Sequence, residues 1–330
     1  MQGQKGGLGV TGTDIAAVIV AARLQAGRVL VIDLCARDGA ELPAFEAGAH
    51  IDVEIEPGLV RQYSLCSDPA ERGHYRIAVL RARPSRGGSE TLHARFAAGQ
   101  EIRVGAPRNL FPLAPGAGPV LLMAGGIGIT PLLAMAHVLH RRGQPFTLHY
   151  CIRSAGDAAF TADIATLPFG HRVQIHASDK AGRFDAAGAL AANPGAQVYS
   201  CGPQGFMDHI ETSARALGFA PAALHREAFG SASASPHAGA DGGFEVVLAR
   251  SGGRSVQVPP GTSIVGALAQ AGISVETVCQ QGICGTCLCT VLEGTPDHRD
   301  SFLSAEEQAA NDQIALCCSR ATSARLVLDL

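Results

Sequence analysis

The stretch CQQGICGTC, residues 279–287, carries the most specific pattern in the 330-residue sequence. Four residues separate its first two cysteines and two residues separate the second pair, at Cys279, Cys284 and Cys287. Gly282 and Gly285 lie between them, and glycine adopts the positive φ angles that a tight loop around a bound group requires. The spacing therefore predicts that this segment holds a metal centre.

Plant-type [2Fe–2S] ferredoxins use Cys-x4-Cys-x2-Cys with a distant fourth cysteine. Here the fourth is Cys317, in ALCCSR, and backbone N–H groups of the glycine-rich loop would point at the cluster sulfurs. A structural zinc site is the main alternative, but zinc prefers two short Cys-x2-Cys pairs and only one is present. Buried free cysteines are a third reading. Cys289 and Cys318 fall outside the spacing and are expected to pack in the core, although Cys318 competes with Cys317 as fourth ligand.

Composition limits the classes of function. A chain of 330 residues with 47% hydrophobic and 17% charged residues predicts two or three globular domains. The net charge of −3 argues against nucleic-acid binding. From residue 244 onward, five Lys or Arg face nine Asp or Glu, so the C-terminal part is acidic and suits docking to a charged protein.

No targeting or membrane segment is expected. Residues 1–13 lack the basic and apolar regions of a secretion signal and are interpreted as a flexible tail. We therefore expect a cytoplasmic protein, where cysteine clusters hold metals more often than disulfides. Residues 120–139 are uncharged and long enough to span a bilayer. Glycines and a proline interrupt this run, which favours a buried strand, a turn and a helix.

The chain divides into three modules. Residues 14–114 contain short alternating strands separated by turns, typical of an antiparallel β-barrel. In residues 115–229 strands alternate with helices, including one near 158–166, which predicts a doubly wound α/β domain with a parallel sheet. Residues 230–243 are rich in Gly, Ser, Ala and Pro and form a linker. Residues 244–330 form a small α+β unit around the cysteine loop.

A [2Fe–2S] cluster takes one electron at a time, whereas a nicotinamide gives up a hydride. A flavin converts between the two, so a flavin site and a nicotinamide site are expected. Arg61, Tyr63 and Ser64 begin a strand in the barrel and offer a phosphate partner, a ring platform and a hydroxyl. The segment Ser85–Ser89 precedes a helix and predicts an anion site. A solvated strand face and a plain glycine turn are the simpler readings.

Two glycine turns in the α/β domain lie between a strand and a helix. MAGGIGITP (123–131) lacks the usual G-x-G-x-x-G spacing, but it still lets a pyrophosphate approach the backbone. In YSCGPQGF (199–206), Cys201 and Gly202 leave room for a flat ring at the end of a strand. A plain core role for Cys201 is the alternative.

Together RQYSL, SRGGS, AGGIGITP, CGP, AFG and CQQGICGTC…C, in this order, resemble the phthalate dioxygenase reductase family. The resemblance implies a flavin-binding barrel, a nicotinamide-binding domain and a plant-type ferredoxin, with FMN as the flavin. It implies that Ser64 and Cys201 act at the hydride-transfer site. The implied cofactor contacts are Arg61, Tyr63, Ser64, Gly87, Gly88, Ser89, Gly125, Gly126, Gly128, Thr130, Cys201, Gly202 and Phe229. The implied cluster ligands are Cys279, Cys284, Cys287 and Cys317.

The resemblance also implies an activity: NADH reduces FMN, and single electrons pass to the cluster and on to a Rieske-type terminal oxygenase. A monomer is expected. NADH is favoured over NADPH because the segment 151–160 offers only Arg153 for a 2′-phosphate, with Asp157 nearby. Three alternatives stay open: a P450 or diiron monooxygenase as acceptor, a non-catalytic redox sensor, and a zinc-bound structural protein.

Overall fold

The structure is a computed structural model of the whole chain, and it divides into two compact units, residues 1–229 and 230–330. It describes residues 15–56, 59–81, 88–229, 242–277, 282, 285–300 and 302–330. The predicted tail, most of the predicted linker, and Gly87, Cys279 and Cys284 lie outside the described residues.

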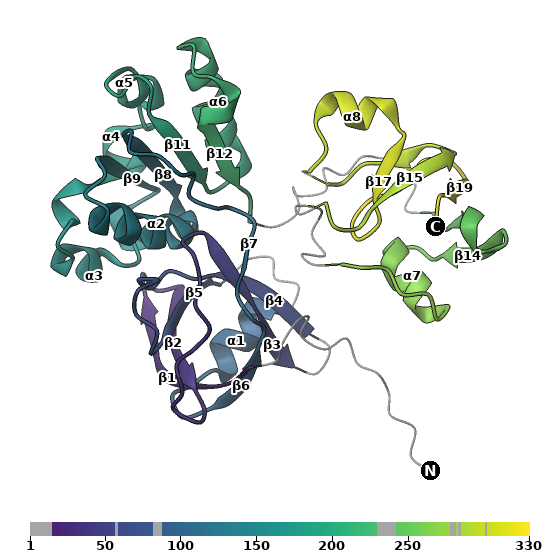
Figure 1. Cartoon of the computed structure of the whole chain (residues 1–330), viewed down its shortest axis with the longest axis horizontal. Helices are drawn as coiled ribbons and strands as arrows, with labels where there is room; N and C mark the ends of the chain where they lie inside the picture. The colour runs from purple at the N-terminus through teal and green to yellow at the C-terminus, as the bar shows by residue number, and fades with distance from the viewer. Residues whose placement is uncertain are drawn as a thin grey trace. The chain divides into compact units, whose positions relative to one another are not determined.

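The first part of unit 1 is a rolled antiparallel sheet, as the alternating sequence predicts (Figure 1). Its strands follow the order β4-β3-β6-β1-β2-β5, with β7 paired to β3. A hydrogen bond joins the two ends of the sheet: the N–H of Cys66, which follows β4, donates to the carbonyl of Arg76 in β5 at 2.9 Å. The elements are β1 (Ile15–Gln25), β2 (Val29–Ala36), β3 (Ala49–Glu56), β4 (Leu59–Ser64), β5 (Tyr75–Leu80), α1 (Gly88–Arg95), β6 (Glu101–Val104) and β7 (Arg108–Asn109).

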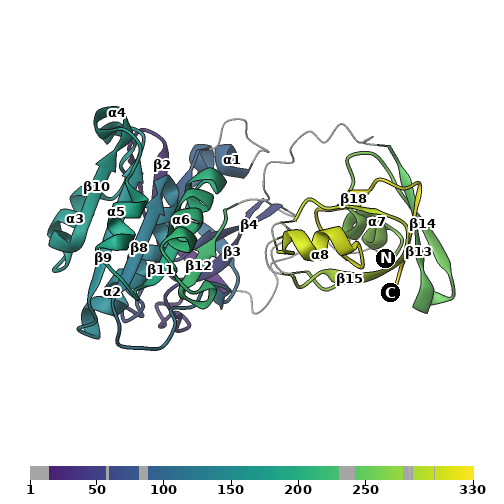
Figure 2. The same cartoon turned by 90° about the horizontal axis from the view of Figure 1, so that it is seen from above.

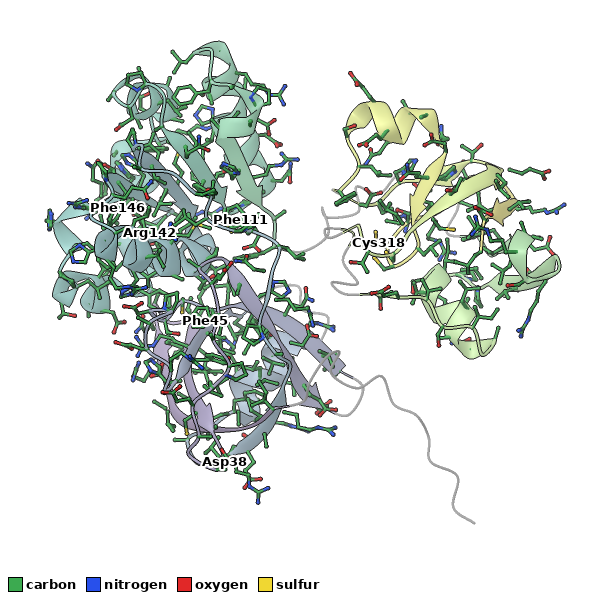
Figure 3. All side chains as sticks on the ribbon, viewed as in Figure 1. Asp38, Phe45, Phe111, Arg142, Phe146 and Cys318 are labelled. Atoms are coloured by element: carbon green, nitrogen blue, oxygen red, sulfur yellow. The ribbon has the colours of Figure 1, made fainter. Side chains whose placement is uncertain are left out.

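Strand alternation sets what faces the interior of the barrel. Ile51 and Val53 of β3 are fully buried and belong to the barrel core, and Tyr63 packs against the same core. Phe45, labelled in Figure 3, meets Tyr75 edge-on with ring centroids 5.6 Å apart. On β3 and β4, the residues that alternate with these core-facing ones therefore point to the opposite face of the sheet, which carries polar side chains.

The second part of unit 1 is a five-stranded parallel sheet in the order β10-β9-β8-β11-β12 (Figure 2). The strand order reverses between β8 and β11, and ligands of such sheets bind at the carboxyl ends of the strands flanking that point. The strands are β8 (Val120–Gly125), β9 (Phe146–Ile152), β10 (Val173–Ala177), β11 (Gln197–Cys201) and β12 (Leu224–Glu227). The helices are α2 (Ile129–Arg141), α3 (Thr161–Thr166), α4 (Ser178–Ala181), α5 (Ala186–Ala191) and α6 (Gln204–Ala216).

The uncharged run 120–139 forms β8, a 3-10 turn (Gly126–Gly128) and α2, as its glycines predict. Successive residues of β8 serve two cores: Leu122 and Ala124 pack with α2, whereas Leu121 and Met123 pack with α5 and α6. Burial on both faces explains why the run is continuously apolar. In the part of the chain that the structure describes, no helix is long and apolar enough to cross a membrane.

Unit 2 is a mixed sheet in the order β14-β13-β19-β15-β17, with α7 packed against it. The strands β13 and β19 pair in parallel, and their neighbours pair antiparallel. This is the predicted ferredoxin-type α+β fold. The elements are β13 (Phe244–Leu248), β14 (Arg254–Val258), α7 (Ile264–Gln270), β15 (Leu288–Glu293), β16 (Pro296–Asp297), α8 (Ala305–Ala310), β17 (Gln313–Ala315), β18 (Arg320–Ala321) and β19 (Arg325–Leu328).

Candidate functional site

A cavity of about 540 Å³ opens at the carboxyl ends of the parallel strands. Gly125 and Gly126 from the end of β8 and Gly202 from the end of β11 line it, as predicted for a nucleotide site. Val29 and Leu80 of the barrel contribute to the same wall. The reversal of strand order and the cavity thus coincide, which is the usual place for a dinucleotide in this architecture.

The glycines at these strand ends allow two backbones to approach closely. A Cβ on Gly202 would lie 2.8 Å from the Cα of Gly125, and a Cβ on Gly125 would lie 2.9 Å from the rings of Pro203 and Phe206. A Cβ on Gly128 would overlap the carbonyl of Cys201. Gly128 is absent from the described lining of the cavity, so in this structure it serves the packing of β11.

We expect Gly128→Ala to lower the free energy of unfolding of unit 1 by about 1–3 kcal/mol, because the new methyl group has no room beside Cys201. Gly205→Ala is the matched control: its Cβ would meet open space near the start of α6, so alanine there should be neutral or slightly stabilising. Thermal unfolding of both variants checks this, and equal melting temperatures would contradict it.

Two predicted cofactor contacts are buried away from the cavity. Thr130 is 2% exposed, and its hydroxyl donates to the Ile127 carbonyl at 3.1 Å. Cys201 is fully buried at the end of β11. Neither residue is part of the described cavity lining. Burial, and then the carboxyl of Glu227, raise the pKa of the Cys201 thiol well above its ordinary value, so this sulfur is a neutral thiol.

The cavity also contains residues that sequence reasoning did not select. Arg183, His176 and Phe184 line it together with Arg153. The rings of His176 and Phe184 lie 4.7 Å apart and are tilted by 54° to each other, so two aromatic rings contribute to the cavity wall. These residues belong to β10 and the segment after α4, where no motif marks them. The predicted residue Phe229 also lines the cavity and is 42% exposed.

The predicted phosphate partner Arg61 lies beside the start of α1. Its Cγ and Nε are each 3.2 Å from where a Cβ on Gly88 would be, and its Nη1 donates to the Val60 carbonyl at 2.8 Å. Ser89 follows Gly88 in the first turn of the helix, and the N-terminus of a helix favours an anion. Burial raises the pKa of Tyr63 to about 12, so its phenol is neutral. An arginine at a helix N-terminus and a neutral tyrosine one strand position from a serine fit a flavin phosphate and ring.

Ser64 at the end of β4 is 6% exposed, and its hydroxyl donates to Oε2 of Glu227 at 3.5 Å. Burial raises the pKa of Glu227 to about 8, and the hydrogen bond from Ser64 offsets this only in part. Glu227 is the register partner of Cys201 in the parallel sheet. The two predicted catalytic residues, Ser64 and Cys201, therefore flank one protonated carboxyl that sequence reasoning missed.

In unit 2, two of the four predicted cluster ligands lie in the described residues. Cys287 is 4% and Cys317 9% exposed. The Gly282 N–H donates to Sγ of Cys317 at 3.3 Å, the kind of amide-to-sulfur bond that a cluster loop provides. Cys318, labelled in Figure 3, is half-buried on the other side of Gly282, where a Cβ on that glycine would overlap its sulfur. Soft thiolate donors suit an iron–sulfur cluster.

Asp300 and Phe302 pack against Gly282 and Gly285 of this loop. Asp300 is 6% exposed, accepts hydrogen bonds from the Leu303 N–H and the Ser319 hydroxyl, and its Cα lies 2.8 Å from where a Cβ on Gly282 would be. Phe302 is 48% exposed, and its ring occupies the space a side chain at Gly285 would need. Both glycines have φ near +70°, so any other residue there would be strained as well as crowded.

Comparison with known proteins identifies a matching family model and full-length relatives. A model for the 2Fe-2S iron-sulfur cluster binding domain matches residues 248–322. The chain is 46% identical to a vanillate O-demethylase oxidoreductase of Pseudomonas sp. (strain HR199 / DSM 7063), over 96% of this chain and 100% of that protein.

Two solved structures are similar over 96% of this chain. Phthalate dioxygenase reductase, described as a modular structure for electron transfer from pyridine nucleotides to [2Fe-2S], matches over 98% of its own chain with 36% identity and a TM-score of 0.81. An intact type IV self-sufficient cytochrome P450 monooxygenase matches over 41% of its chain with 37% identity and a TM-score of 0.74. Because these similarities extend over nearly its whole length, the chain belongs to the phthalate dioxygenase reductase family and is an oxidoreductase.

Proposed function

We propose that this protein is the NADH-dependent reductase component of a Rieske-type aromatic-ring oxygenase, with FMN in the barrel and a [2Fe–2S] cluster in unit 2. One observation carries the proposal. Glu227 joins the end of β4, where Ser64 lies, to the end of β11, where Cys201 lies. The predicted flavin residue Ser64 and the predicted nicotinamide residue Cys201 are thus linked through one carboxyl, and Gly202, the residue after Cys201, lines a cavity of dinucleotide size.

The residues of this site have distinct tasks. Arg61 and the start of α1 hold a phosphate, Tyr63 supports a planar ring, and the glycines of β8 and β11 admit a second ring close to the backbone. A bound flavin accepts hydride and passes electrons on singly. The neutral Cys201 thiol and the protonated Glu227 add no negative charge beside the nicotinamide, whose oxidised form is a cation.

The choice of NADH rests on Asp157, which lines the cavity and repels a 2′-phosphate. Two features oppose it. Arg28 lies 3.6 Å from Asp157 and compensates its charge, and Arg183 adds a cation that the sequence of the segment 151–160 did not suggest. The proposal of NADH requires that Asp157 outweighs Arg28, Arg153 and Arg183 in selecting the cofactor.

The acceptor is proposed from charge and redox potential. Plant-type clusters have potentials near about −400 mV and Rieske centres span about −150 to +300 mV, so electrons would flow downhill to a Rieske partner. The acidic C-terminal module suits a basic docking surface on that partner.

An anaerobic absorption spectrum before and after limiting NADH tests the proposal. We expect mixed flavin and iron–sulfur bands that bleach with NADH, and bleaching at least about tenfold slower with NADPH. Chromatography of the heat-released flavin should identify FMN. A colourless protein, or a coloured one that ignores NADH, would remove the reductase proposal, and a preference for NADPH would overturn the role of Asp157.

A P450 acceptor is the second candidate, because a self-sufficient P450 monooxygenase contains a segment similar to 96% of this chain. Reduction of a purified Rieske oxygenase component and of a bacterial P450 can be compared at equal concentrations. Faster reduction of the P450 would favour the second candidate.

A further inference from the structure

The turn between β1 and β2 belongs to the barrel, but its first residue contacts the parallel-sheet part of unit 1. Ala26 and Gly27 have φ angles of +48° and +64°, and the Arg28 N–H donates to the Gln25 carbonyl at 3.2 Å. Two successive residues with positive φ make a tight hairpin turn whose twist matches that of the flanking strands. This turn fixes the position of Gln25 at the end of β1.

The side-chain amide of Gln25 forms two hydrogen bonds with the segment that begins α3. Its Oε1 accepts from the Phe160 N–H at 2.6 Å, and its Nε2 donates to Oδ2 of Asp163 at 2.9 Å. Phe160 immediately precedes α3, and Asp163 lies in the first turn of that helix. One side chain of the barrel therefore holds the start of α3, although Gln25 and Phe160 are 135 residues apart in sequence.

Phe160 has a backbone conformation that requires support from its surroundings. Its φ of +64° lies in the left-handed region, which is unfavourable for a residue with a Cβ, and its side chain is 1% exposed. Residues in such conformations persist where several contacts fix them, and they are concentrated at ligand-binding and switch sites. The hydrogen bond from the Phe160 N–H to Gln25 is one of the contacts that fix this conformation.

The residues next to these two partners line the cavity. Arg28 and Val29 follow the Gln25 turn, and Asp157 and Ala159 precede the strained residue; all four are part of the cavity wall. Nε of Arg28 lies 3.6 Å from Oδ1 of Asp157, so the two sides of this wall also meet through their charges. The hairpin of the barrel and the segment before α3 thus form one wall, and Gln25 joins its two halves.

We propose that Gln25 is a positioning residue for the nicotinamide cofactor: its two hydrogen bonds hold the segment before α3 in the conformation that binds the nucleotide. Gln25 is absent from the described lining of the cavity, so it acts through Asp157 and Ala159. A wall that already has its bound conformation loses less conformational freedom on binding, which raises the affinity. The inference rests on the proposed function and assigns part of nucleotide recognition to the barrel.

A second contact between the barrel and the parallel-sheet part provides the matched control. Asp68, which follows β4, pairs with Arg141 and, at 3.6 Å, with His137, and both partners belong to α2. None of these three residues is part of the described cavity lining. If Gln25 did no more than fasten the two parts together, loss of either contact would have the same effect on cofactor binding.

The first test compares Gln25→Met, which keeps the length of the side chain without its hydrogen bonds, with Asp68→Ala. Loss of two neutral hydrogen bonds should raise the Kd of NAD⁺ and the KM of NADH in dye reduction by about tenfold. The kcat at saturating NADH should stay within about twofold of wild type, because the contact between Ser64 and Glu227 is untouched. Asp68→Ala should change none of the three constants by more than about twofold. Calorimetric titration with NAD⁺ and steady-state kinetics measure them.

A charge exchange tests whether the Gln25 hydrogen bonds themselves are responsible. Gln25→Glu keeps an acceptor for the Phe160 N–H but sets a second carboxylate against Asp163, so NAD⁺ affinity should fall. Adding Asp163→Asn to the same chain restores an amide opposite the carboxylate, and the Kd should return to within about twofold of wild type. A double variant that binds NAD⁺ no better than Gln25→Glu alone would contradict the proposal.

A third measurement uses the wild-type chain and does not depend on whether any variant folds. If the cofactor binds the conformation that Gln25 holds, NAD⁺ at about ten times its Kd should slow hydrogen exchange of the Phe160 N–H by about tenfold. Unchanged exchange would overturn the inference, as would unchanged affinity in Gln25→Met or an equal loss in Asp68→Ala. A wild-type chain that neither binds NAD⁺ nor oxidises NADH would instead refute the proposed function.

Discussion

Replacing Cys287 by serine is expected to abolish electron delivery to an external acceptor protein while leaving NADH-driven dye reduction close to wild type. Cys287 is buried in the core of unit 2 and is one of four predicted thiolates around the cluster. Losing even an outer partner of a metal ligand costs about 10- to 100-fold, so loss of a ligand should reduce delivery to the acceptor by about a hundredfold or more. Dye reduction needs only the proposed flavin and nucleotide sites, whose predicted residues all lie in unit 1.

Cys289→Ser is the matched control for this prediction. Cys289 lies two positions further on and is also buried, and its thiol donates to the carbonyl oxygen of the next residue, Thr290. It falls outside the ligand spacing, so the variant should keep the iron–sulfur absorption and electron paramagnetic resonance signals. The iron content of the two variants and their rates of cytochrome c reduction test this prediction. Normal cytochrome c reduction by Cys287→Ser, or cluster loss in Cys289→Ser, would refute the proposed ligand set.

The sequence predicted those parts of the molecule that depend on local patterns. Apolar alternation marks the barrel strands, the uncharged run 120–139 marks a strand and helix buried on both faces, and glycines mark the turns at the strand ends. Each of these depends on residues within a few positions of each other. The helix expected near 158–166 begins later, at Thr161, because Phe160 has a φ of +64°, a left-handed conformation that the interior of an α-helix does not accommodate.

The parts that sequence reasoning missed depend on contacts between distant segments. Gln25 meets Phe160 across 135 residues of sequence, and Glu227 meets Ser64 from a strand 163 residues away. Arg183 enters the cavity from a segment without a motif. Conversely, Gly128 was predicted to contact the cofactor, but the atom nearest to a Cβ at this position would be the carbonyl oxygen of Cys201. A glycine in a turn reveals that space is short without revealing what fills it.

Glu227 shows how such a contact shapes the properties of the whole unit. Its carboxyl lies at the junction between the barrel and the parallel sheet, where burial raises its pKa to about 8, from an ordinary value of 4.5. Between these two values the folded chain binds one proton more than the unfolded chain. The stability of unit 1 therefore falls as the pH rises from about 5 to about 8, and it levels off above pH 9.

Glu227→Gln should remove this pH dependence. The amide cannot ionise, so at pH 9 the variant should be more stable than wild type by roughly 3–5 kcal/mol, whereas at pH 5 the two should be nearly equal. Calorimetric unfolding of unit 1 at pH 5, 7 and 9 measures the difference. Asp208→Asn is the control, because its side chain is 52% exposed and its carboxyl contacts the Arg226 and Gln204 side chains at the surface, so the pH dependence of wild type should persist. A Glu227→Gln variant that loses stability toward pH 9 as steeply as wild type would show that Glu227 is already ionised at pH 7, and the protonated carboxyl assigned to the site would then be wrong.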